Sequence, residues 1–209
     1  MITAPQRAVL VLLTTASVAL SAVGPGAGAH AQEFSRADAD AMQAKLLLMQ
    51  EAAESPRASG APQVRTSLSE SELNADFEHY GESFLPPGIA KPRATLLDGG
   101  RLVARAIVDL STVRLGGEGG LFDPLSYLRG SVEVVATGTM VGSDGEGLIR
   151  FVSATVAGIS VPKQVAQELL RFYTRTAERP GGFQFDAPFA MPAQVQSVSG
   201  VRGSVTVMQ

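Results

Sequence analysis

The longest alternation of apolar and polar positions in the chain lies between residues 131 and 161. A period of two is the signature of a β-strand with one buried face. A glycine-rich turn at 142–147, which contains Asp144, separates two such runs and predicts a hairpin. The small or apolar side chains expected on one face are Val132, Val134, Ala136, Gly138 and Met140, continued by Leu148, Val152, Ala154 and Val156.

The period then changes to that of a helix. Pro162 suits a first helical turn, and Val165, Leu169 and the pair Phe172 and Tyr173 follow at helical spacing. The pattern therefore predicts an amphipathic helix over 162–174 that packs on the apolar face of the hairpin.

A second amphipathic helix is predicted over 69–80. Ser69 and Glu72 have the spacing of a capping box, in which each side chain bonds a backbone N–H of the other residue. Asn74, the single asparagine of the chain, lies in the first turn and can bond a neighbouring backbone group. The apolar positions of this helix are Leu73, Phe77 and Tyr80.

Two more hairpins are predicted, at 94–110 and 195–208. In the first, apolar residues alternate with Arg101, Arg105 and Asp109, as expected when one face is buried and the other is in water. The apolar set is Leu102, Ala104, Ala106, Val108 and Leu110. The three hairpins and two helices predict an α+β domain over 64–209, with one twisted antiparallel sheet and helices on its apolar face.

The first residues have the pattern of a secretory signal peptide. Arg7 precedes an uncharged apolar run over 8–23, and the small residues Ala29 and Ala31 flank His30 before the expected cleavage point. We therefore expect residues 1–31 to be removed, and the mature protein to begin at Gln32 in the periplasm or the medium. An uncleaved membrane anchor is the alternative. No later stretch has the ~20 apolar residues of a transmembrane segment.

Residues 32–63 are expected to form an N-terminal helix, over 36–54, and a linker. The helix has an apolar stripe that favours docking on the sheet over binding a membrane surface, because its polar side is not basic. The stripe consists of Met42, Leu46 and Met49, widened by Leu47, Leu48 and Ala53.

Charge and cysteine content narrow the function classes. The chain has 17 basic and 20 acidic residues, a net charge of −3, and no cysteine. A mildly acidic chain without basic runs argues against nucleic-acid binding. The absence of cysteine excludes disulfides, thiol chemistry and a lipid anchor on cysteine.

The residue types needed for catalysis do not gather in any recognised pattern. After residue 31 the chain has a single histidine, His79, which can pair with Asp76 or lie beside it on a solvated helix face. The acidic pairs fall at helix starts or in turns, where they complement local backbone dipoles. We therefore predict no catalytic set, no metal site and no cofactor.

Apolar surface remains as the candidate functional feature. Ala104 and Ala106 are small residues in the middle of a strand, so the space above them is either filled by helix side chains or left as a cavity for a ligand. The candidate lipid-binding residues are Leu73, Phe77, Tyr80, Leu102, Ala104, Ala106, Val108, Leu169, Phe172 and Tyr173. The glycine-rich, then apolar, segment at 115–130 is either a lid or a crossover that packs at a barrel rim.

Short motifs over 64–208 resemble those of bacterial exported YceB-like and DUF2993 (LmeA)-like proteins. The motifs lie at 66–74, 85–89, 156–162 and 189–195. These families resemble tubular lipid-binding (TULIP) domains, so the resemblance implies a long curved antiparallel sheet wrapped on one or two amphipathic helices, with an apolar groove. It also implies binding of a lipid or other amphiphile in the cell envelope. YceB-like members are lipoproteins, and this chain lacks the cysteine that would be acylated.

A second function class stays open. The same hairpins can present strand edges to an envelope protein, so a periplasmic interaction or assembly module with a filled core is the alternative to a lipid-binding protein.

Overall fold

The computed structural model describes residues 34–54, 62–112, 130–177 and 179–209. The predicted signal peptide, most of the linker at 55–63 and nearly all of the 115–130 segment lie outside the described residues. In chain order, the helices and strands are α2 (Arg36–Glu54), β1 (Arg65–Ser69), α3 (Glu70–Tyr80), β2 (Ile89–Leu96), β3 (Arg101–Asp109), β4 (Ser131–Ser143), β5 (Glu146–Val156), β6 (Ile159–Ser160), α4 (Lys163–Tyr173), β7 (Pro188–Ala190), β8 (Ser197–Val201) and β9 (Ser204–Met208). Short 3₁₀ turns follow α3, β2 and β3.

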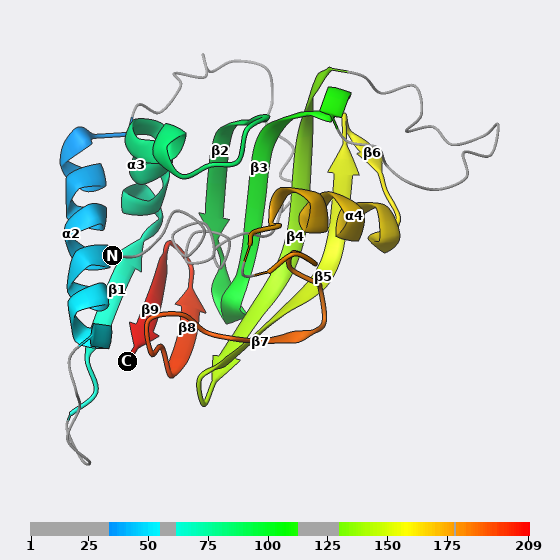
Figure 1. The fold of residues 1–209 in the computed structure, drawn as a ribbon. Helices are drawn as coiled ribbons and strands as arrows, with labels where there is room; N and C mark the ends of the chain where they lie inside the picture. Colours follow the sequence, from blue (N-terminus) through cyan, green and yellow to red (C-terminus); the bar gives the residue numbers. More distant parts are fainter. Residues whose placement is uncertain (1–33, 55–61, 113–129, 178) are drawn as a thin grey trace.

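The strands of the described part form one antiparallel sheet, which confirms the predicted α+β class (Figure 1). The long strand β4 organises it. One edge of β4 pairs with β5, and the other edge is shared by β3, along Ser131 to Thr139, and by β8, at Gly142. The sheet therefore divides into a β2–β3 branch and a β8–β9–β1 branch, and β6 and β7 add to the outer edge of β5.

The helices lie over the two ends of this sheet. In Figure 1, α2 and α3 lie side by side next to β1 and β2, whereas α4 crosses β4 and β5. None of the helices within the described ranges is long and apolar enough to cross a membrane.

The predicted helix starts are confirmed. The Ser69 hydroxyl accepts a hydrogen bond from the Glu72 N–H, and the Glu72 carboxylate accepts one from the Ser69 N–H, so the capping box is complete. Pro162 is the cap residue of α4. Two orphan N–H groups at the start of α3 are thus satisfied by side chains that the sequence places three residues apart.

The predicted central hairpin is also confirmed, with one correction. Asp144 and Gly145 both have positive φ, 55° and 81°, as a two-residue type I′ turn requires. Leu148 and Val152, however, do not share a face with Ala154. A β-bulge at Val152 places one extra residue opposite Thr137 and Gly138, and this shifts the alternation of β5 by one position.

Two clusters of buried apolar residues hold the layers together. The first lies beneath α2 and α3 and includes Met42, Met49, Leu73, Phe77, Leu96 and Leu102. The second lies beneath α4 and includes Val108, Ala154, Val156, Ala166 and Leu169. The candidate site lies between these two clusters.

The N-terminal helix α2 packs on α3 through both apolar and polar side chains. The Gln43 amide donates to the Asp76 carboxylate, and Lys45 pairs with Glu72 at 2.7 Å. Asp76 is fully buried, so its expected place on a solvated face is wrong. The predicted widening of the apolar stripe is also wrong for Leu47 and Leu48, which are 55% and 62% exposed.

Candidate functional site: an apolar cavity between α4 and the sheet

A row of four alanines crosses the sheet from β2 to β5. Ala94 lies opposite Ala104, Ala104 opposite Ala136, and Ala136 opposite Ala154, so the row spans β2 to β5. The residues between these alanines point to the opposite face of the sheet, where Arg105 pairs with Glu133 at 3.0 Å. The methyl groups of Ala104, Ala136 and Ala154 leave room that Val or Leu would otherwise fill, whereas Ala94 lies in the packed cluster beneath α3.

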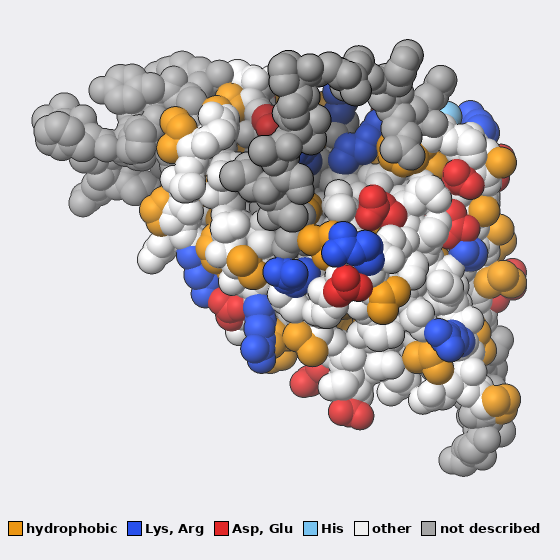
Figure 2. All heavy atoms as spheres, turned by 180° about the vertical axis from the view of Figure 1, so that it is seen from behind, with side chains coloured by type: hydrophobic (Ala, Val, Ile, Leu, Met, Phe, Trp, Pro, Cys, Tyr) orange, Lys and Arg blue, Asp and Glu red, His pale blue; other side chains and the backbone are white. Residues whose placement is uncertain are grey.

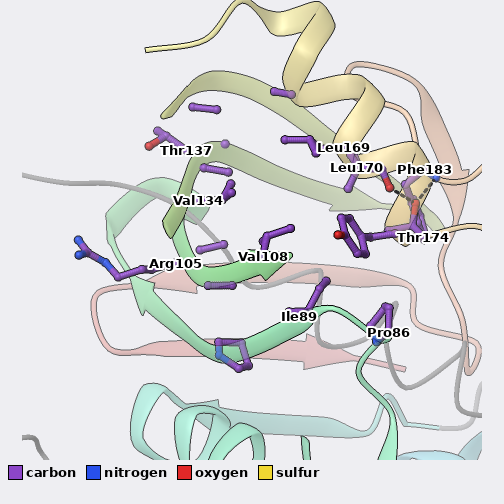
Figure 3. Close-up of a pocket in the computed structure, with 18 of the residues that line it drawn as sticks. Pro86, Ile89, Arg105, Val108, Val134, Thr137, Leu169, Leu170, Thr174 and Phe183 are labelled. Atoms are coloured by element: carbon purple, nitrogen blue, oxygen red, sulfur yellow. Dashed lines mark hydrogen bonds between the residues drawn. The ribbon is translucent and has the colours of Figure 1, made fainter. Parts of the chain in front are cut away.

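Three of these alanines, Ala104, Ala136 and Ala154, line a cavity of about 200 Å³ between the sheet and α4 (Figure 3). The helix covers the row with Ala166, Leu169 and Leu170. The other lining residues are Phe77, Leu85, Pro86, Ile89, Pro92, Arg93, Arg105, Ala106, Val108, Val134, Thr137, Gly138, Ile149, Val156, Tyr173, Thr174, Phe183 and Phe185. The cavity is thus formed where small strand residues face a helix that is too distant to fill the space.

The polar groups at the helix end of the cavity are bonded within the protein. The Tyr173 hydroxyl donates to the Asp109 carbonyl at 2.7 Å. The Thr174 hydroxyl donates to the Leu170 carbonyl at 2.6 Å and accepts from the Phe183 N–H at 2.7 Å. These groups therefore offer the interior no unused donor, and an occupant of this part of the cavity must be apolar.

The charged residues of the lining direct their side chains elsewhere. Figure 3 shows the Arg105 side chain extending away from the apolar side chains of Val108, Val134 and Leu169. Arg93 pairs with Glu78 and stacks on Phe34. The face seen from behind carries acidic and basic side chains close together (Figure 2), in contrast to the apolar lining of the cavity.

The C-terminal segment anchors α4 over the cavity. The Asp186 carboxylate pairs with Lys163 at the start of α4 and accepts from the Phe151 N–H, while the Asp186 N–H donates to the Ile149 carbonyl at 2.8 Å. The hydrogen bond from Lys163 is the main cause that holds the pKa of Asp186 below its ordinary value. Gln167 adds bonds to the carbonyl of Phe183 and the N–H of Phe185. These contacts join α4 to residues 183–186, and Asp186 in turn joins this segment to β5.

The structure brings six of the ten predicted site residues to the cavity. These six are Phe77, Ala104, Ala106, Val108, Leu169 and Tyr173. Leu73 and Leu102 lie in the filled cluster beneath α3. Tyr80 turns toward α2, where its hydroxyl donates to Asp40, and that bond raises the pKa of the phenol. Phe172 is 37% exposed and packs edge-on against Tyr173, with ring centroids 5.0 Å apart.

Sequence reasoning missed several lining residues. The small face predicted for β4 already contained Ala136, Val134 and Gly138. The strand register that places Ala136 opposite Ala104, however, could not be predicted from the sequence pattern. Phe183 and Phe185 lie in an irregular segment without periodicity, so nothing in the local pattern places them at the cavity.

His79, the single histidine of the described residues, bonds the Phe34 carbonyl at 2.9 Å and lies on α3, outside the cavity lining. Within the described ranges, no three residues among His, Asp and Glu converge as metal ligands.

No protein-family model, curated protein or solved structure matches the chain. The arguments about function therefore rest on the cavity itself.

Proposed function

We propose that the protein is an exported, non-enzymatic binding protein that holds the hydrocarbon part of a lipid or other amphiphile in the cavity beneath α4. The observation that carries this proposal is an apolar space of about 200 Å³ over a row of alanines. The lining residues Ala104 and Ala136 are only half-buried, so apolar surface of this space faces water, and an apolar occupant would remove it from water. An open apolar space of this size therefore favours an occupant.

The size of the cavity indicates what it holds. A dry apolar cavity of roughly 150 Å³ accommodates benzene in another protein. By proportion, the cavity here holds a segment of about eight carbon atoms. This matches part of one alkyl chain, with the rest of the ligand outside the cavity.

The outer edges of β2 and β5 support this proposal over strand addition at those two places. On the open side of β2, the Asn74 amide accepts from the Ala94 N–H and donates to the Ala94 carbonyl, both at 2.7 Å. The Leu96 N–H donates to Glu70, and Pro92 has no N–H. The edge of β5 is likewise occupied by Asp186, β6 and β7. An added strand would find few free backbone donors at these places.

Ligand extraction and titration test the proposal. Protein purified from its native host, extracted with organic solvent and analysed by mass spectrometry, is expected to release an amphiphile. The delipidated protein is expected to bind a fluorescent fatty acid saturably, at one site per chain. If no amphiphile co-purifies and no alkyl probe binds saturably, the lipid-binding function is rejected and a packed interaction domain remains.

A further inference from the structure

A second hollow, of about 320 Å³, has one lining residue in common with the cavity, Phe183. Its other lining residues are Arg179, Gly181, Gly182, Gln184, Ala187, Pro188 and Phe189. Among the described residues that line this hollow none is acidic, and Arg179 carries the charge with its guanidinium.

Arg179 is held in the hollow by aromatic contacts. Its guanidinium carbon lies 3.8 Å from the centroid of the Phe183 ring and 6.0 Å from that of Phe189, and the two rings pack edge-to-face. In the described part of the chain, no carboxylate lies within ion-pair distance of Arg179. Stacking occupies the face of a guanidinium and leaves the N–H donors at its edge free to bind an anion.

The backbone around Phe183 fixes the ring between the two spaces. The Phe183 N–H donates to Thr174, and its carbonyl accepts from Gln167 at 3.0 Å. Gly182 has a φ of 65°, and a Cβ there would lie 2.4 Å from the Arg171 carbonyl oxygen. The turn that presents Phe183 and Arg179 is therefore closely packed against the end of α4.

From this arrangement we infer that the ligand is a single-chain amphiphile with an anionic head group, a carboxylate or a phosphate monoester. Its alkyl chain lies in the cavity and passes the edge of the Phe183 ring. Its head group lies in the outer hollow and accepts hydrogen bonds from Arg179, which can bind such anions through two parallel N–H groups. This inference rests on the proposed function of the cavity and adds the chemical class of the head group.

Chain-matched probes test the head group. Isothermal titration calorimetry of the mature protein at neutral pH would compare decanoate, decyl phosphate and decanol, which share one chain. Because charge-assisted hydrogen bonds are the stronger kind, the anions are expected to bind about tenfold more tightly than the alcohol. Arg179→Gln should abolish this preference and leave decanol binding unchanged. A preference for only one of the two anions would support the inference and identify the head group.

Two further variants separate a local contact from general charge. Arg175→Gln removes the same charge from a nearby exposed position and should keep the preference for anions. Arg179→Lys keeps the charge but cannot stack or bind through two parallel donors, and should retain only part of the preference. Equal binding of the three probes to the unmodified protein would overturn the inference while leaving the cavity's function intact. An equal loss in Arg175→Gln and Arg179→Gln would also overturn it. Failure of all three probes to bind would reject the proposed function as well.

Discussion

Replacing an alanine of the row by a larger residue tests whether the space above it is unfilled. Ala136 lies in the middle of the row, between Ala104 and Ala154, and lines the cavity. Ala136→Leu adds three carbon atoms to a space that holds about eight. We expect the variant to be more stable than the unmodified protein and to bind alkyl ligands more weakly, because the new side chain occupies part of the ligand's volume.

The magnitude follows from the carbon count. Three carbons at about 0.8 kcal/mol each give roughly 2.4 kcal/mol of burial. Ordering the leucine side chain costs about 0.5–1 kcal/mol, so the net stabilisation is about 1.5 kcal/mol. For a domain of this size, such a gain raises Tm by about 3–6 °C. Differential scanning calorimetry of the ligand-free protein measures this shift, and titration with a fluorescent fatty acid measures the loss of affinity.

Ala94→Leu is the matched control. Ala94 belongs to the same row, but it lies in the filled cluster with 2% of its surface exposed and does not line the cavity. Overpacking there should lower the stability by about 1–3 kcal/mol. If Ala136→Leu lowers Tm as Ala94→Leu does, the space above Ala136 is already filled and the reasoning fails.

Three more predictions follow from other contacts. Asp186→Asn should remove the ion pair with Lys163, whose stabilising effect is complete above the unfolded pKa of about 4 and is lost as the pH falls through the lower folded pKa. Urea denaturation should therefore show that the difference in unfolding free energy between the two proteins shrinks on acidification. A difference that does not change with pH would contradict a stabilising role of this ion pair. Asn74→Ala leaves the Ala94 N–H and carbonyl without their partner and should cost about 2–5 kcal/mol in chemical denaturation; a change below about 0.5 kcal/mol would show that Asn74 does not protect this edge. N-terminal sequencing of protein from the native host should begin at or near Gln32, whereas a start at Met1 in the envelope fraction would indicate a retained anchor.

Interactions between residues close together in the sequence determined where the helices and turns begin. The helix over Glu70–Tyr80 begins where Ser69 and Glu72 can exchange hydrogen bonds, and the β4–β5 turn forms where Asp144 and Gly145 tolerate positive φ. These interactions join residues a few positions apart, so the sequence shows both partners at once. The two periodicities, near two and 3.6, likewise indicated which residues of each element face inward.

The cavity depends on registers that no single element contains. Each alanine of the row is unremarkable in its own strand, and only the pairing of β3 with β4 and of β4 with β5 aligns them. The bulge at Val152 shows the same limit, because one extra residue changes which side chains of β5 face α4. Asp76 is a further example, since its burial depends on the docking of α2, a helix more than 20 residues away in the chain.

The sequence by itself therefore determined the α+β class, the helices, the hairpins and the small residues that make a cavity possible. The tertiary structure decided that α4 covers three of those alanines without filling the space between them, while α3 fills the space above the fourth. The physical reason is that packing is a sum over contacts between distant segments, whereas caps, turns and periodicity are set by neighbours in the chain.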